Sequence, residues 1–128
     1  MGLVRWFTLT GLALVLACGN DTSGTGTQGG CTPAATKVCM ANILFNPATL
    51  TVTRGTTVTW ENADGVGHTT TSNPSNPAAC PTWDNAVAGG TTSPGVVFNP
   101  SGAVTCQYYC KIHATPTTGA MRATIAVQ

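Results

Sequence analysis

The feature that most restricts the fold of this chain is a repeated alternation of apolar and polar residues. Between residues 103 and 110 the apolar set is Val104, Cys106, Tyr108 and Cys110, and the intervening set is Thr105, Gln107 and Tyr109. The same period of two recurs at residues 49–53, 56–61 and 121–127. Successive side chains of a strand point to opposite faces, so each segment is expected to bury one face. No segment shows a convincing helical period.

Further β-prone segments and turn signals complete this pattern. Residues 38–45, 68–72 and 95–98 are rich in strand-forming residues, and Asn46-Pro47 and Arg54-Gly55 mark turns. Residues 73–81 hold three prolines and two asparagines, so they are expected to form a loop. Seven or eight short strands in the 98 residues from 31 to 128 predict one all-β sandwich domain.

The small number of charges excludes one class of partner. The 128 residues contain five basic and four acidic side chains, and no Lys/Arg cluster is present. Nucleic acid is therefore not expected as a partner, because nothing would neutralise its phosphates. The 15 glycines and 8 prolines, with few Glu, Lys and Leu, also argue against a helical bundle.

The N-terminus has the features of an export signal. Arg5 precedes an apolar stretch, Trp6–Leu16, which is shorter than the roughly 20 residues of a membrane-spanning helix. Ala17-Cys18 resembles the lipobox of bacterial lipoproteins, and this resemblance implies cleavage after residue 17 and lipidation of Cys18. We therefore expect a periplasmic protein anchored by lipid to the inner or the outer bacterial membrane. The alternative is an ordinary secretory signal that contains a cysteine.

A short polar segment separates this signal from the expected domain. Residues 19–30, GNDTSGTGTQGG, contain no apolar residue and no period. Such a composition is typical of a flexible tether. The sequence therefore predicts a signal peptide at 1–17, a lipidated cysteine and tether at 18–30, and a folded domain at 31–128.

Four side chains form a candidate metal-binding set. Cys110 and His113 lie at the end of a predicted strand, Met121 begins the next strand, and His68 begins an earlier one. One thiolate, two imidazoles and one thioether suit copper, which cycles between Cu(I) and Cu(II). Two His and one Cys in a plane, with a weak axial Met, describe a blue-copper electron-transfer site.

The same segments resemble a known family. VCMANILFNPATLTVTRGTTVTWEN, GVGHTTTS, WDNAV and TCQYYCKIH…GAMRATIAV are similar to the plastocyanin/amicyanin-type cupredoxins. The resemblance implies an eight-stranded Greek-key sandwich with one copper ion at one end. It implies His68, Cys110 and His113 as equatorial ligands and Met121 as the axial ligand. It also implies that the backbone N–H of Thr69 donates to the cysteine sulfur.

One spacing departs from the family pattern. Seven residues, Ala114–Ala120, separate His113 from Met121, and the plastocyanin-type pattern has fewer. Met121 still binds if this loop bulges outward. Otherwise Met121 is a buried core residue that fills space.

The remaining cysteines suggest disulfides. With Cys18 and Cys110 assigned, four cysteines are left, and the sequence alone leaves three pairings open. In the topology that the resemblance implies, the strand from His68 lies beside the strand ending at Cys110. This arrangement favours Cys80–Cys106 and leaves Cys31–Cys39.

Three functions fit these residues. The first is a monomeric one-electron carrier whose redox partners dock weakly near His113, beside Ile112, Ala114, Pro116 and Val66. The second is a copper-delivery protein, which would need labile, exposed ligands. The third is a structural zinc domain that uses Cys106, Cys110 and His113. An enzyme is not expected, because the sequence shows no carboxylate pair, Ser-His-Asp set or phosphate loop.

Overall fold

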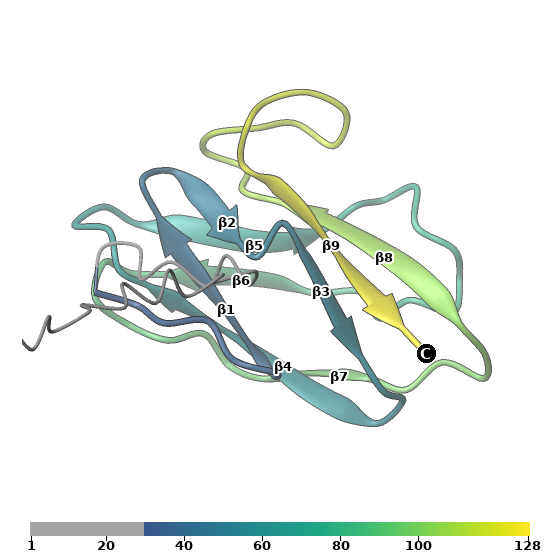
Figure 1. Cartoon of the computed structure of the whole chain (residues 1–128). Helices are drawn as coiled ribbons and strands as arrows, with labels where there is room; N and C mark the ends of the chain where they lie inside the picture. Colours follow the sequence, from purple (N-terminus) through teal and green to yellow (C-terminus); the bar gives the residue numbers. More distant parts are fainter. Residues whose placement is uncertain (1–29) are drawn as a thin grey trace, which may run out of the picture.

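The structure, a computed structural model, describes residues 30–128, which fold into two packed β-sheets (Figure 1). The expected signal peptide, Cys18 and residues 19–29 of the expected tether lie outside the described residues. The all-β sandwich is confirmed, with one strand more than the eight expected. The strands are β1 (Lys37–Ala41), β2 (Leu44–Asn46), β3 (Thr49–Val52), β4 (Thr56–Asn62), β5 (His68–Ser72), β6 (Asp84–Val87), β7 (Val96–Phe98), β8 (Val104–Tyr109) and β9 (Arg122–Val127).

The strand order places β8 inside the larger sheet. One sheet has the order β2-β1-β4-β7 and the other β3-β9-β8-β5-β6. The β1–β4 and β3–β9 pairs are parallel, and the other pairs are antiparallel. β8 is hydrogen-bonded to β9 on one side and to β5 on the other, and the β8–β9 loop extends beyond the ends of both strands (Figure 1). The end of β8 is therefore a well-supported place for a functional side chain.

The predicted alternation matches the core. Cys106 and Tyr108 of β8 are buried, whereas Thr105 and Gln107 are exposed. The indole of Trp60 fills the centre, with its ring centroid 5.8 Å from that of Trp83 and 5.4 Å from that of Tyr108. Aromatic rings at such separations contribute packing beyond their buried area. These aromatic contacts join β4 of one sheet to β8 of the other.

The segment 38–45, expected as one strand, is two strands joined by a tight turn. β1 and β2 pair with Ala41 opposite Leu44, so Asn42 and Ile43 form the two-residue turn. Both residues have positive φ, 55° and 60°. Such turns favour residues that tolerate φ > 0, and Ile43 is β-branched and tolerates it poorly. Because Ile43 is not a typical turn residue, the sequence alone does not predict this turn.

The structure also contains a strand that the sequence did not predict. β6 covers Asp84–Val87 and pairs with β5, with His68 opposite Val87. Asp84 and Asn85 are depleted in strands in general. β6 lies at the edge of the five-stranded sheet, and an edge strand tolerates polar residues because one of its sides faces solvent.

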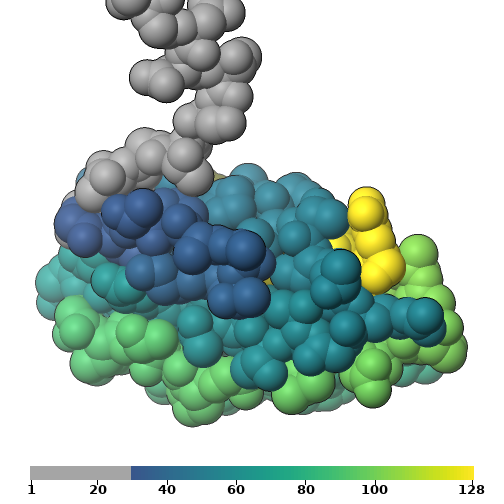
Figure 2. All heavy atoms as spheres, turned by 60° about the horizontal axis from the view of Figure 1, so that its bottom comes forward, coloured from purple at the N-terminus to yellow at the C-terminus, as the bar shows by residue number. Residues whose placement is uncertain are grey.

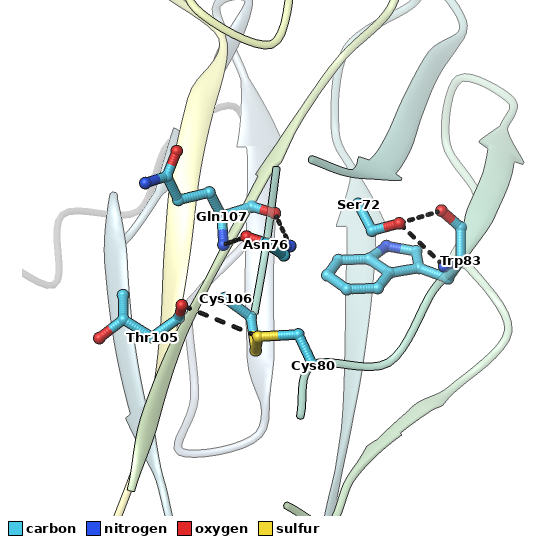
Figure 3. Close-up of a disulfide and its surroundings, with 7 residues drawn as sticks. All are labelled: Ser72, Asn76, Cys80, Trp83, Thr105, Cys106 and Gln107. Atoms are coloured by element: carbon cyan, nitrogen blue, oxygen red, sulfur yellow. Dashed lines mark hydrogen bonds between the residues drawn. A yellow bond between two sulfur atoms is a disulfide. The ribbon is translucent and has the colours of Figure 1, made fainter. Parts of the chain in front are cut away.

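Two disulfides form, with the pairing that the family resemblance implied. Cys31 bonds to Cys39 and Cys80 bonds to Cys106. Figure 3 shows the second bond attaching the 73–83 connection to the middle of β8. Beside it, the Asn76 carboxamide replaces strand pairing: its Nδ2 donates to the Gln107 carbonyl at 2.8 Å, and its Oδ1 accepts from the Gln107 N–H at 2.8 Å. The residues expected as a loop are therefore held against β8, the strand that precedes Cys110.

The residues from 30 to the start of β1 pack against the rest of the domain. Cys31 is buried, and in Figure 2 the dark-blue segment that starts at Gly30 lies flat against the molecule. β1 then pairs with β4.

Residues 30–128 contain no helix long and apolar enough to cross a membrane.

Candidate metal centre

A turn after β8 brings Cys110 and His113 together. Cys110 continues the buried face of β8, and its N–H donates to the Met121 carbonyl at 3.0 Å. The carbonyl of Cys110 then accepts from the N–H groups of His113 (3.2 Å) and Ala114 (2.9 Å). These bonds close a tight turn, which directs the His113 side chain back toward the sulfur.

His68 reaches the same point from the neighbouring strand. It is the first residue of β5, and its side chain is fully buried. β5 runs antiparallel to β8, so the beginning of β5 lies beside the end of β8. His113, in contrast, is half-buried. The two imidazoles meet edge to face, with ring centroids 4.9 Å apart.

The three side chains converge on one centre. His68 Nδ1 lies 3.2 Å from His113 Nδ1, and Cys110 Sγ lies 3.8 Å and 3.5 Å from these two nitrogens. A first-row metal bonded at about 2.0 Å to nitrogen and about 2.3 Å to sulfur separates its ligands by roughly 3.3–3.8 Å at trigonal or tetrahedral angles. The observed separations are close to these values. The donor set therefore fits a copper ion in both chemistry and spacing.

A carboxylate orients the His68 ring through Nε2. His68 Nε2 lies 2.8 Å from Asp64 Oδ2. An ionised carboxylate only accepts hydrogen bonds, so Nε2 carries the proton and Nδ1 keeps its lone pair for the metal. Partial burial acts to raise the pKa of the Asp64 carboxyl, but the pKa lies below its usual value because Ile43, His68 and Asn42 donate hydrogen bonds to it. Asp64 therefore stays ionised beside its histidine.

Sequence reasoning did not identify Asp64. It lies four residues before His68 in a glycine-rich turn, and this position was the only available signal. Nothing in the spacing indicates that its carboxylate turns back onto the imidazole.

The cysteine sulfur has a backbone partner. The N–H of Thr69 donates to Cys110 Sγ, with nitrogen and sulfur 3.3 Å apart, the contact that the family resemblance implied. The Thr69 hydroxyl has a separate role, because it accepts from the Lys111 N–H at 2.9 Å and bonds to the Thr71 hydroxyl at 3.0 Å. Thr69 therefore holds the sulfur through its backbone and the following turn through its side chain.

The loop before Met121 bulges outward and is held at both sides. Asn73 Nδ2 donates to the Pro116 carbonyl at 2.9 Å, and Arg122 donates to the Thr117 carbonyl at 3.0 Å. Gly119 has φ +100°, and a Cβ there would come within 2.7 Å of the Ala114 Cα, so only glycine fits. Met121 follows with a fully buried side chain. The extra loop length is thus absorbed in a closed loop, and the Met121 carbonyl still accepts from the Cys110 N–H.

The zinc interpretation of the sequence is wrong. It required Cys106 as a thiolate ligand, and the Cys106 sulfur is bonded to Cys80. Among the described cysteines only Cys110 is free, and it is buried. Within residues 30–128, His68, Cys110 and His113 form the one His/Cys/Asp/Glu group of three or more placed to hold a metal ion.

A β-sandwich with two histidines and one cysteine at one end defines a cupredoxin. A family model described as copper binding proteins, plastocyanin/azurin family, matches residues 33–128. The chain therefore belongs to the plastocyanin/azurin family of copper-binding proteins, and copper is its cofactor. No curated protein sequence matches it.

Several solved structures share the fold. The purple cupredoxin of Nitrosopumilus maritimus is 24% identical, with a TM-score of 0.57 over 73% of this chain and 99% of that protein. A mutant of amicyanin in its reduced Cu(I) form is 22% identical, with a TM-score of 0.58 over 77% of this chain and 86% of that one. A copper-containing nitrite reductase from Thermus scotoductus is 20% identical, with a TM-score of 0.60 over 77% of this chain and 23% of the enzyme.

The two roles of Thr69 lead to a first prediction. Thr69→Val leaves the Lys111 N–H without its acceptor, so we expect metal-free protein to lose about 1 kcal/mol of unfolding free energy. Thr69→Ser keeps the hydroxyl and is expected to lose less. Both variants retain the backbone N–H and should keep the absorption of the copper form. Denaturant unfolding checks the stability difference, and equal stabilities of the two variants would contradict it.

Proposed function

We propose that this protein is a type 1 (blue) copper protein that carries one electron at a time between redox partners outside the cytoplasm. The observation that supports this most is the convergence of His68 Nδ1, His113 Nδ1 and Cys110 Sγ at a buried point. Bound copper would supply the one-electron couple between Cu(I) and Cu(II). The protein would supply a coordination shell that suits both states.

The ligands divide into two kinds. His68, Cys110 and His113 would be the strong ligands in one plane, because thiolate favours Cu(I) and imidazole accepts both states. Met121 would be the weak axial ligand. Its complete burial and its backbone bond to Cys110 support this role.

The surroundings of the ligands support electron transfer rather than copper delivery. Cys110 is held by the Met121 carbonyl and the Thr69 N–H, and His68 is held by Asp64. A shell fixed by such contacts changes little when copper gains or loses an electron. Copper delivery requires exposed, labile ligands, whereas His68 and Cys110 are buried.

Electrons would enter and leave through His113. It is half-buried, so its ring is the ligand nearest to solvent. Ile112 is 61% exposed and Val66 is 54% exposed, while Ala114 and Pro116 are half-buried. We propose these residues as a docking surface for redox partners, where a small apolar contact would release its partner quickly. Association through this surface would be transient, and the protein would act as a monomer.

A catalytic role receives less support. The nitrite reductase shares the fold, but this chain covers only 23% of its length. Within the described residues, the metal-binding group is the single set of two histidines and one cysteine. We therefore propose a carrier rather than an enzyme.

We also propose that Cys18 is lipidated and anchors the domain to a bacterial membrane from the periplasmic side. The Ala17-Cys18 pair after the apolar stretch supports this location, and the two disulfides suit an oxidising compartment.

The first test of the function is the colour of the copper form. Copper-loaded protein should show the intense thiolate-to-copper absorption of a blue-copper site. Cys110→Ser, a nearly isosteric change, should retain the fold and lose this band. Ile112→Ser changes an exposed neighbour and should retain the band. A colourless wild-type copper complex, or a Cys110→Ser variant that stays blue, would refute the assignment.

The second test concerns Met121. Met121→Leu removes the thioether, which should raise the reduction potential, and Met121→Gln introduces a harder oxygen ligand, which should lower it. Met40→Leu is the matched control, because Met40 is also fully buried but lies on β1. Voltammetry of the copper forms measures the shifts. If potential and absorption are unchanged in both Met121 variants, Met121 is a core residue only.

The third test concerns the anchor. A lipid chain contributes about 0.8 kcal/mol per buried CH₂, and stable anchoring requires more than one chain. Native protein should therefore fractionate with membranes, and Cys18→Ser should not be lipidated. Native protein recovered without lipid in the soluble periplasmic fraction would disprove the proposal.

A further inference from the structure

The carboxylate of Asp64 connects the candidate metal centre to the β1–β2 turn, which is distant in sequence. Its Oδ2 accepts from His68 Nε2 at 2.8 Å and from the Ile43 N–H at 3.1 Å, and its Oδ1 accepts from the Asn42 N–H at 2.7 Å. The side chain is only 17% exposed. One partly buried carboxylate therefore accepts hydrogen bonds from the His68 imidazole and from both residues of the β1–β2 turn.

Asp64 is itself held in place. Its N–H donates to Asn62 Oδ1 at 3.0 Å, and the Asn62 amide donates to the carbonyls of Val66 (2.8 Å) and Val87 (3.0 Å). Asn62 is buried at the end of β4. On the other side, a Cβ at Gly89 would lie 2.8 Å from the Asp64 carbonyl, so the backbone there is closely packed. The position of the carboxylate is thus set by β4 and by the segment after β6.

The turn depends on the same carboxylate. Asn42 and Ile43 both adopt left-handed backbone, which costs a β-branched residue roughly 1–2 kcal/mol. Their N–H groups point to the Asp64 oxygens. Charge-assisted bonds of this kind are stronger than neutral ones, and they offset the strain of the turn. The turn and the imidazole therefore share one anionic acceptor.

We propose that Asp64 is a positioning residue that, braced by the β1–β2 turn, fixes His68 as an Nδ1 donor and strengthens the binding of oxidised copper. The proposal rests on His68 being a copper ligand, as proposed above. A carboxylate that accepts from the distal nitrogen orients the ring and makes the imidazole more basic. Its negative charge near the metal favours Cu(II) over Cu(I), so its removal should raise the reduction potential.

The structure provides a charge-matched control. Asp84 is also a carboxylate near the site, and it pairs with Lys111, the residue after Cys110, and with the Thr71 hydroxyl. Its side chain is 53% exposed, and it contacts neither histidine through any hydrogen bond or ion pair given by the structure. Asp84→Asn removes the same charge without removing a ligand contact.

The test compares Asp64→Asn with Asp84→Asn in copper-loaded protein. Loss of a partner of this kind typically lowers metal affinity by about 10–100-fold. We expect Asp64→Asn to lower Cu(II) affinity by this factor and Cu(I) affinity by less, and to shift the potential upward. Asp84→Asn should leave both nearly unchanged. Equal shifts in the two variants, or no shift in a folded Asp64→Asn variant, would overturn the proposal.

A second measurement needs no copper. Nitrogen NMR of the metal-free protein reports which ring nitrogen of His68 carries the proton. Wild type and Asp84→Asn should show the proton on Nε2, and Asp64→Asn should show a mixture of the two tautomers. Unchanged nitrogen shifts in Asp64→Asn would overturn the role of Asp64. If wild type and Asp64→Asn differ in the His68 tautomer but the copper complex is colourless, the blue-copper function is rejected. The role of Asp64 in orienting His68 then still stands.

A variant of the β1–β2 turn keeps the test possible if Asp64→Asn does not fold. Ile43→Gly retains the backbone N–H that donates to Asp64 and removes the strain of the left-handed backbone. The reduction potential of this variant should therefore match that of wild type. If Asp64→Asn alone does not fold, the double variant Ile43→Gly/Asp64→Asn provides a relaxed turn in which the loss of the carboxylate is measured. A double variant with wild-type potential and tautomer would contradict the proposal.

Discussion

The metal centre depends on the pairing of β8 with β9, which continues beyond both strands through the Cys110 N–H and the Met121 carbonyl. This bond joins Cys110 to Met121, which is eleven residues later in the chain. The loop between them therefore closes without disturbing the sheet. The turn that brings His113 back to the sulfur starts from the same residue. Without the paired strands, neither the Cys110 sulfur nor the His113 imidazole would have a fixed position.

The contacts around this pairing make the site rigid from several directions. The aromatic core fixes β8 against the opposite sheet, and the Cys80–Cys106 bond holds the 73–83 connection against its middle. Thr69 of β5 contacts the sulfur, and Asp64 contacts the buried imidazole. The cysteine sulfur and the buried imidazole are thus supported by different elements. In the proposed electron carrier this arrangement would limit how far the coordination shell relaxes when the copper charge changes.

Much of this was predictable from sequence because its signals are local. The alternation Cys106-Tyr108-Cys110 fixes which face of β8 is buried, and the Cys110–His113 spacing places both donors in one turn. Other features depend on contacts distant in sequence. Ile43 adopts left-handed backbone where the Asp64 carboxylate accepts its N–H, and the partly polar β6 pairs with the edge that β5 offers. Propensity describes a residue alone and cannot include such partners.

The positions of the donors along the chain affect how metal binding and folding are coupled. Cys110 and His113 are three residues apart, so even an unfolded chain holds them near each other, whereas His68 lies 42 residues before Cys110. A metal that also binds the unfolded chain stabilises the native state by less than its full affinity. At the proposed copper site, the local Cys–His pair would therefore be available to the ion in the unfolded chain as well, whereas His68 would join it only in the folded chain.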